Sequence, residues 1–209
     1  KHKTKNKFAT MAIKKLKNPE SSVVFPPQVL QPLVECLNDN NVEIRLGAEE
    51  ALEAIGESAL DPLILSLNQR NEKLQSNIWM LIRKSGPVGI NHLILALTNE
   101  DKNIVIIAAF LLITIGSESG KKPVIKLLSH KEPLVRVEVY WQIVTRKPKW
   151  QDSDWNLREV VESLIEALGS PEEYVQSKAG RGLERITGKA YGVNKEEWKK
   201  WWAENKEKF

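Results

Sequence analysis

The feature that most constrains the fold of this chain is an apolar pattern that recurs every thirty residues. The segment from Leu30 to Leu37 returns at residues 60–67 and again at 90–97. A fourth copy, at 123–128, is shifted by one residue, and a fifth, at 163–168, arrives about ten residues late. Because one short helical unit cannot bury its own apolar face, a chain with this period is predicted to stack its units on one another.

A second apolar pattern follows each copy, after a short polar stretch. Its residues are spaced by three or four positions, as the buried face of a helix requires. The predicted core positions are Ile44, Ala48, Leu52 and Ile55, then Ile78 and Ile82, then Ala108, Leu112 and Ile115, then Val139 and Ile143, and finally Ala179, Leu183 and Ile186. Gly56, Gly86 and Gly116 stand thirty residues apart and are predicted to end the second helix, where a left-handed backbone favours glycine.

One unit is therefore predicted to be a helix, a tight turn, a second helix and a stop. Pro32, Pro62 and Pro123 are expected early in the first helix, because the first-turn N–H groups lack helical partners there. The predicted fold is all-α: a right-handed α-α superhelix of about five helical-hairpin repeats with a C-terminal capping helix.

The expected organisation has three parts. Residues 1–27 are predicted to be a basic N-terminal arm and partial capping helix, 28–188 the repeat solenoid, and 189–209 a tryptophan-rich C-terminal helix. In that last helix the spacing of Trp198, Trp201 and Trp202 places three indoles on one face. They are interpreted as a cap over the last repeat, with a partner-binding or membrane-surface helix as the alternative.

The first repeat carries the residues by which a family resemblance can be judged. They are Pro32-Leu33, Leu37, Asp39, Val42, Arg45, Ala48, Ala51-Leu52 and Ile55-Gly56. With them, residues 28–188 resemble HEAT repeats in the short form, of about thirty residues, of the phycobilisome-lyase-like group. The resemblance implies that Arg45 and Arg136 pair with acids in the turns. Gln75, Val105 and Gln176 depart from that pattern, which predicts a broken polar ladder along the stack.

The charge of the chain is unevenly distributed. The net charge is +4, yet residues 18–209 carry 24 basic and 27 acidic side chains. The excess comes from seven lysines at the N-terminus, Lys1, Lys3, Lys5, Lys7, Lys14, Lys15 and Lys17. This arm is interpreted as a solvated terminus, with contact to nucleic acid or another anionic surface as the alternative.

The start of the chain and its hydropathy bear on where the protein is found. The first residue is not methionine, which fits either removal of an export signal or a trimmed sequence. No apolar stretch reaches the length that a membrane-spanning helix needs. We therefore expect a soluble protein, either cytoplasmic or exported after cleavage.

No pattern in the sequence indicates an enzyme. There is no phosphate-binding glycine loop, no nucleophile elbow, no zinc-protease helix and no His-Glu dipeptide of the di-iron HEAT-fold hydroxylases. A single cysteine, Cys36, is expected in the core, His92 at a helix start and His130 in a solvated turn. The prediction is a protein without catalytic residues, metal or cofactor, although a lyase-type HEAT-repeat protein stays as an alternative.

The second helices suggest a binding surface. The position held by Glu50 in the first repeat is Met80, Phe110 and Trp141 in the next three and Arg181 in the last, so large apolar residues fall in register in the middle repeats. The predicted partner-binding residues are Trp79, Met80, Ile106, Phe110, Ile113, Tyr140, Trp141, Val144, Trp150 and Trp155. An apolar patch of this kind either binds a partner or is covered by the curvature of the chain or by the insert at 146–156.

The sequence therefore predicts a non-catalytic protein-protein interaction module that binds through the apolar concave face of its middle repeats. The expected partner is another protein, a larger multisubunit complex for which this chain is a scaffold or assembly subunit, or a second copy of itself. The alternative is nucleic-acid binding through the basic arm. The slightly acidic body disfavours this alternative, because phosphate binding needs clustered lysine and arginine.

Overall fold

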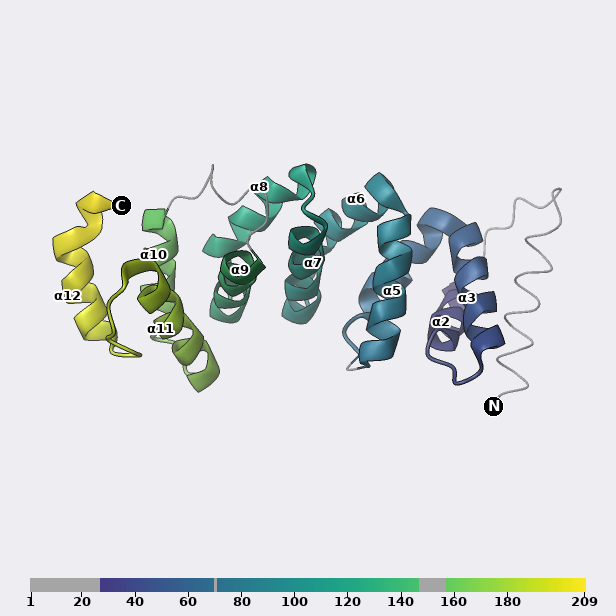
Figure 1. The fold of residues 1–209 in the computed structure, drawn as a ribbon, viewed down its shortest axis with the longest axis horizontal. Coiled ribbons are helices and arrows are strands. Elements are labelled where there is room, and N and C mark those ends of the chain that lie inside the picture. Colours follow the sequence, from purple (N-terminus) through teal and green to yellow (C-terminus); the bar gives the residue numbers. More distant parts are fainter. Residues whose placement is uncertain (1–26, 70, 147–156) are drawn as a thin grey trace. The chain divides into compact units, whose positions relative to one another are not determined.

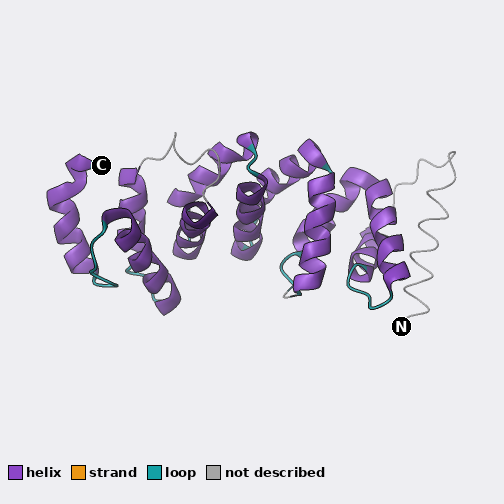
Figure 2. Ribbon diagram, in the orientation of Figure 1, coloured by secondary structure: helices purple, strands orange, loops and turns teal. Residues whose placement is uncertain are grey.

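The computed structural model describes residues 27–69, 71–146 and 157–209, and these residues form helices and turns without any strand (Figure 2). The basic arm and most of the insert, with Trp150 and Trp155, lie outside the described residues. The chain divides into two compact units, Lys1–Ala96 and Leu97–Phe209. Figure 1 labels the helices of both units along the chain.

Unit 1 is a stack of paired helices. Its elements are α2 (Pro27–Cys36), α3 (Val42–Ile55), the short 3-10 helix η1 (Gly56–Ala59), α4 (Leu60–Ser66), α5 (Glu72–Lys84) and α6 (Gly86–Ala96). Helix α2 packs on α3 and α4 packs on α5, while α4 also contacts α2 and α6. First helices thus stack on first helices and second helices lie beside second helices, which is the packing of a solenoid.

Unit 2 continues the pattern. Its elements are α7 (Lys102–Ile115), α8 (Glu118–Lys126), η2 (Leu127–Ser129), α9 (Pro133–Arg146), α10 (Leu157–Ala167), α11 (Glu173–Thr187), α12 (Lys195–Asn205) and η3 (Lys206–Lys208). The second helices α7, α9 and α11 pack in succession, and α10 contacts α9, α11 and α12. The all-α solenoid predicted from the thirty-residue period is confirmed.

In the first three repeats the polar stretch supplies the start of the next helix. Asn41, Asn71 and Asp101 stand thirty residues apart and occupy the N-cap positions of α3, α5 and α7. Each side-chain oxygen accepts a hydrogen bond from a backbone N–H two or three residues later, at 2.9, 3.0 and 2.9 Å. Such a bond satisfies one of the N–H groups that the first turn leaves without a helical partner.

The predicted glycine stops are found at the C-termini of α3 and α7. Gly56 and Gly116 have φ of 69° and 70° and follow the last helical residue. Gly86 also has a positive φ, 58°, but it follows the C-cap of α5 and is the first residue of α6. Glycine takes this backbone region without the steric cost that a Cβ would add.

The proline prediction is correct in only one of three helices. Pro62 is the third residue of α4, in its first turn, as expected. Pro32 and Pro123 are each the sixth residue of their helix, because α2 and α8 begin earlier than the repeat pattern predicts. Both prolines therefore lie beyond the first turn, where the missing N–H removes a helical hydrogen bond.

The predicted core is found between the stacked helices. The buried members of the predicted set are Ile44, Ala48, Leu52, Ile78, Ile82, Ala108, Leu112, Val139, Ile143, Ala179 and Leu183. The last position of the pattern, at Ile55, Ile115 and Ile186, is only half-buried. Cys36 is buried, as expected of a core cysteine.

Side-chain amide and guanidinium groups fix the turns between paired helices. Arg45 and Arg136 donate from Nη1, at 2.7 Å, to the backbone carbonyl six residues earlier. Gln75 and Gln176 donate from Nε2 to the carbonyl at the same offset, at 3.1 and 2.7 Å. These bonds to backbone carbonyls are contacts that the predicted pairing with acids did not include. The predicted break is wrong at both glutamines, because glutamine has the N–H donor that the bond needs.

The C-terminal helix covers the last repeat. Trp198 and Trp202 are buried, and α12 packs on α10. The indole of Trp202 donates to Oε1 of Glu162 on α10 at 3.2 Å, and that of Trp198 donates to the Gly192 carbonyl at 2.9 Å. This is the arrangement of a cap, in which the indoles face the protein. Over the described residues, no helix is long and apolar enough to cross a membrane.

Candidate functional site

Phe110 and Trp141 are the predicted binding residues around which unit 2 builds a surface. They lie on the neighbouring helices α7 and α9, and both side chains are half-buried. A half-buried aromatic ring has one side fixed by its own chain and the other available to a ligand. Such rings are typical anchors of protein interfaces.

Two other predicted residues of unit 2 do not belong to this surface. Ile113 and Tyr140 are each only 2% exposed, so the expectation that they face a groove is wrong. The Tyr140 ring packs against Gly182 of α11: a Cβ added at Gly182 would lie 2.8 Å from Cε1 of the ring. The Tyr140 hydroxyl donates a hydrogen bond to the Gly182 carbonyl at 3.3 Å. The absence of a side chain at Gly182 makes room for the ring. Burial also raises the pKa of the Tyr140 phenol far above its usual value.

Of the remaining predicted residues, some lie in unit 1, one lies in unit 2, and the others are not among the residues or side chains that the structure describes. Trp79 and Met80 are half-buried on α5 in unit 1, and Ile106 is half-buried on α7 in unit 2. The guanidinium of Arg83 lies 5.5 Å from the centre of the Trp79 ring. The indole nitrogen of Trp79 is buried without a hydrogen-bond acceptor among the described residues. The side chain of Val144 is outside the description.

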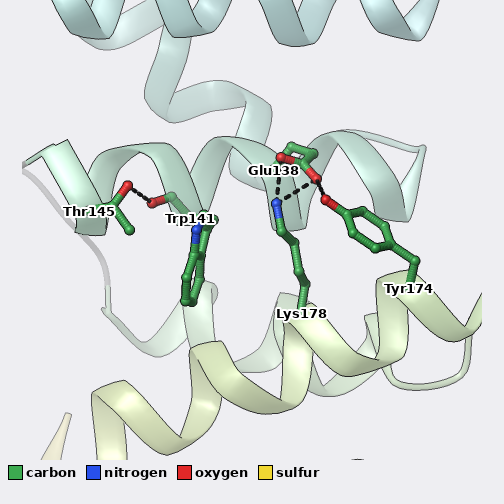
Figure 3. A network of polar contacts seen from close by, with 5 residues as sticks. All are labelled: Glu138, Trp141, Thr145, Tyr174 and Lys178. Carbon is green, nitrogen blue, oxygen red and sulfur yellow. Dashed lines mark hydrogen bonds and ion pairs between the residues drawn. The ribbon is translucent and has the colours of Figure 1, made fainter.

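A polar network joins α9 to α11 beside Trp141 (Figure 3). Lys178 Nζ lies 2.7 Å from both carboxylate oxygens of Glu138, and the Tyr174 hydroxyl donates to Glu138 Oε1 at 2.6 Å. The Lys178 and Glu138 side chains are only 17% and 12% exposed. Burial lowers the pKa of Lys178, but the hydrogen bonds with Glu138 and Tyr174 outweigh it and raise the pKa overall. Lys178 is therefore charged and fixed in place.

Cations lie over the aromatic rings of this face. Lys178 Nζ is 5.8 Å from the centre of the Trp141 ring and 5.1 Å from that of Tyr174. The guanidinium of Arg146, at the end of α9, is 4.2 Å from the centre of the Phe110 ring. Figure 3 shows Trp141 pointing from α9 toward α11. We call Phe110, Trp141, Arg146, Tyr174 and Lys178 the cation–aromatic surface. Each stacked pair contributes about 0.5–1 kcal/mol when exposed and orders the two side chains.

The sequence prediction found the rings of this surface and missed its charges. A signal for the charges was present: Glu138 and Lys178 occupy equivalent positions of the last two second helices, forty residues apart. Opposite charges at equivalent positions of stacked helices are placed to meet. Arg146 was assigned to the insert, although the structure makes it the last residue of α9.

A second polar cluster lies in unit 1. The His92 ring on α6 contacts two acids of η1 and α4: Nδ1 is 2.7 Å from Asp61 Oδ1, and Nε2 is 3.3 Å from Glu57 Oε1. Burial lowers the pKa of His92, but the hydrogen bonds with both carboxylates outweigh it and raise the pKa overall. The cluster ties α6 to the preceding repeat. His92 is the seventh residue of α6 rather than a residue at its start.

No family model matches the chain, and no curated protein matches it either. Among solved structures, the chain is similar to the designed armadillo repeat protein YIII(Dq)4CqI. The identity is 21% over 88% of this chain and 92% of that chain, with a TM-score of 0.34.

Proposed function

We propose that this chain is a non-catalytic protein-protein interaction module, a scaffold or assembly subunit, that binds its partner through the cation–aromatic surface of unit 2. The observation that carries the proposal is the pair of half-buried rings, Phe110 and Trp141, on adjacent helices, each with a cation stacked on it. Helical repeat proteins commonly use the side chains of successive helices in this way.

Preorganisation supports a binding role for this surface. Glu138 and Tyr174 hold Lys178 beside Trp141, so little side-chain entropy remains to be lost when a partner binds there. Aromatic and arginine side chains are also those that contribute most to the stability of protein interfaces. The resemblance to short HEAT repeats of the phycobilisome-lyase-like group is part of the same proposal, and it too agrees with an assembly role.

The proposal is tested by affinity capture with matched variants. The test variant is Phe110→Gln with Trp141→Gln, and the control is Leu65→Gln with Leu95→Gln. The control leucines lie on α4 and α6 of unit 1 and are 54% and 66% exposed. Circular dichroism first establishes that both variants keep the helical signal of the wild type.

The expected result is that proteins captured by the wild type and by the control are lost from the test variant. Light scattering on the purified protein measures its mass in solution and so tests whether the partner is a second copy of the chain. If the test variant captures the same proteins and has the same mass in solution as the wild type, the cation–aromatic surface is not the interface.

A further inference from the structure

One face of α11 carries a row of cations that begins in the cation–aromatic surface. Lys178, Arg181 and Arg185 are spaced by three and four residues, so they share one face of the helix. Lys178 is neutralised by Glu138, whereas Arg181 and Arg185 are exposed and form no ion pair with another described residue. Arg146 of α9 likewise has no carboxylate partner there; its Nε donates to the amide oxygen of Gln142 at 3.0 Å.

The acids of the same helices offset only part of this charge. Glu138 is engaged by Lys178 and Tyr174, and Glu184 Oε1 accepts a hydrogen bond from the Gly192 N–H at 3.2 Å. Glu173 is exposed but lies at the opposite end of α11 from Arg185. The C-terminal halves of α9 and α11 therefore present three guanidinium groups next to the half-buried rings.

From this charge distribution we infer that the partner segment that docks on the cation–aromatic surface is acidic, with aspartate or glutamate side chains flanking an apolar one. The inference rests on the proposed function and names the chemistry of its partner. Guanidinium groups bind carboxylates through two parallel hydrogen bonds, and the apolar side chain packs on Phe110 or Trp141. The two contacts together need both parts of the surface.

Nucleic acid is the other anionic class, and the charges disfavour it. A duplex or single strand is bound by clusters of lysine and arginine that follow many phosphates. Here only three arginines are available, and residues 18–209 carry more acidic than basic side chains. A short acidic peptide matches three cations and two rings; a phosphate backbone does not.

The test uses a random peptide library displayed on phage, selected on the intact chain. Fluorescence anisotropy then measures the affinity of the most enriched labelled peptide for the wild type and three variants. The charge variant is Arg181→Ala with Arg185→Ala. Its control is Lys122→Ala with Lys126→Ala, which removes the same charge from exposed positions of α8. The third is the Phe110→Gln, Trp141→Gln variant.

We expect enrichment of acidic peptides that contain an aromatic or aliphatic residue. The charge variant should bind about tenfold more weakly, and added salt should weaken the wild-type complex, because exposed ion pairs are screened. The α8 control should bind as tightly as the wild type. Selected peptides that are neutral or basic, no selection at all, or equal binding by the charge variant overturns the inference.

Two further outcomes separate the inference from the proposed function. Peptides that lose binding with the ring variant but not with the charge variant overturn the acidic partner while supporting the surface. Peptides that bind the ring variant as tightly as the wild type count against the proposed function itself. A labelled single-stranded oligonucleotide is tested in the same assay. If it binds more tightly than the selected peptide and loses binding with the charge variant, the partner is nucleic acid and not an acidic peptide.

Discussion

Replacing Gly182 by alanine tests why Tyr140 is buried rather than part of the binding surface. A Cβ at this position would lie 2.8 Å from Tyr140 Cε1 and 3.1 Å from Leu164 Cδ1. Alanine in place of a helical glycine gains about 1 kcal/mol from helix propensity. Overpacking a closely packed core costs about 1–3 kcal/mol. We therefore expect the free energy of unfolding of unit 2 to fall by about 1 kcal/mol.

The measurement is urea unfolding followed by circular dichroism, with amide hydrogen exchange of α11 as a local readout. The control is the difference in free energy of unfolding between the Arg181→Gly and Arg181→Ala variants. Arg181 is an exposed position of the same helix. There alanine should be favoured by about 1 kcal/mol, because no neighbour opposes the propensity gain.

A double variant separates the clash from other effects. With Tyr140→Leu in the background, the ring edge that meets the new Cβ is gone, so Gly182→Ala should become neutral or stabilising. The coupling free energy between the two substitutions should then reach about 1 kcal/mol or more, as contacting residues show. If Gly182→Ala stabilises the wild type as much as alanine does at position 181, Tyr140 does not fill the space above Gly182, and the explanation for its burial is wrong.

Three further predictions concern other sites. Because the folded-state pKa of His92 is raised, its contribution to stability is complete below the unfolded-state value of about 6.5 and is lost as pH rises through the folded-state value. The thermal midpoint of the wild type should therefore fall with rising pH in that window, and less so with Asp61→Asn. Trp79→Phe removes a buried N–H without an acceptor among the described residues, so its free energy of unfolding in urea should stay within about 1 kcal/mol of the wild type despite the smaller ring. Gln176→Leu should cost about 1 kcal/mol by leaving the turn carbonyl without its donor, whereas Gln176→Arg should unfold at the wild-type urea concentration.

The sequence was sufficient to predict the helices because the same local signals recur in successive repeats. The polar residue before the second helix recurs as Asn41, Asn71 and Asp101, and its capping bond depends only on residues next to it. The same holds for the stops at Gly56 and Gly116. Local interactions of this kind can be read from a single repeat. The division of the chain between Ala96 and Leu97 had no such signal.

The candidate site was predicted less completely, because burial there depends on the next repeat. Trp79 and Tyr140 occupy the same position of the repeat, yet Trp79 is half-buried on its helix, whereas the room left by Gly182 lets Tyr140 pack inward. A residue's own position in the repeat does not contain this information; the residue opposite it does. Gly180 and Gly182 on the facing helix were the available clue, and both are buried.

The two cations of the surface have different roles, and the difference follows from how each is held. Lys178 is fixed by two short contacts to Glu138, so a partner's carboxylate would have to compete with a buried one for the same ammonium. Arg146 is held by one hydrogen bond to Gln142 and by its stacking on Phe110, and it is exposed. Lys178 therefore positions Trp141, while Arg146 and the guanidinium groups of α11 have no carboxylate partner among the described residues and can bind an anion. Removing Lys178 should loosen the surface, whereas removing an arginine should change only what the surface binds.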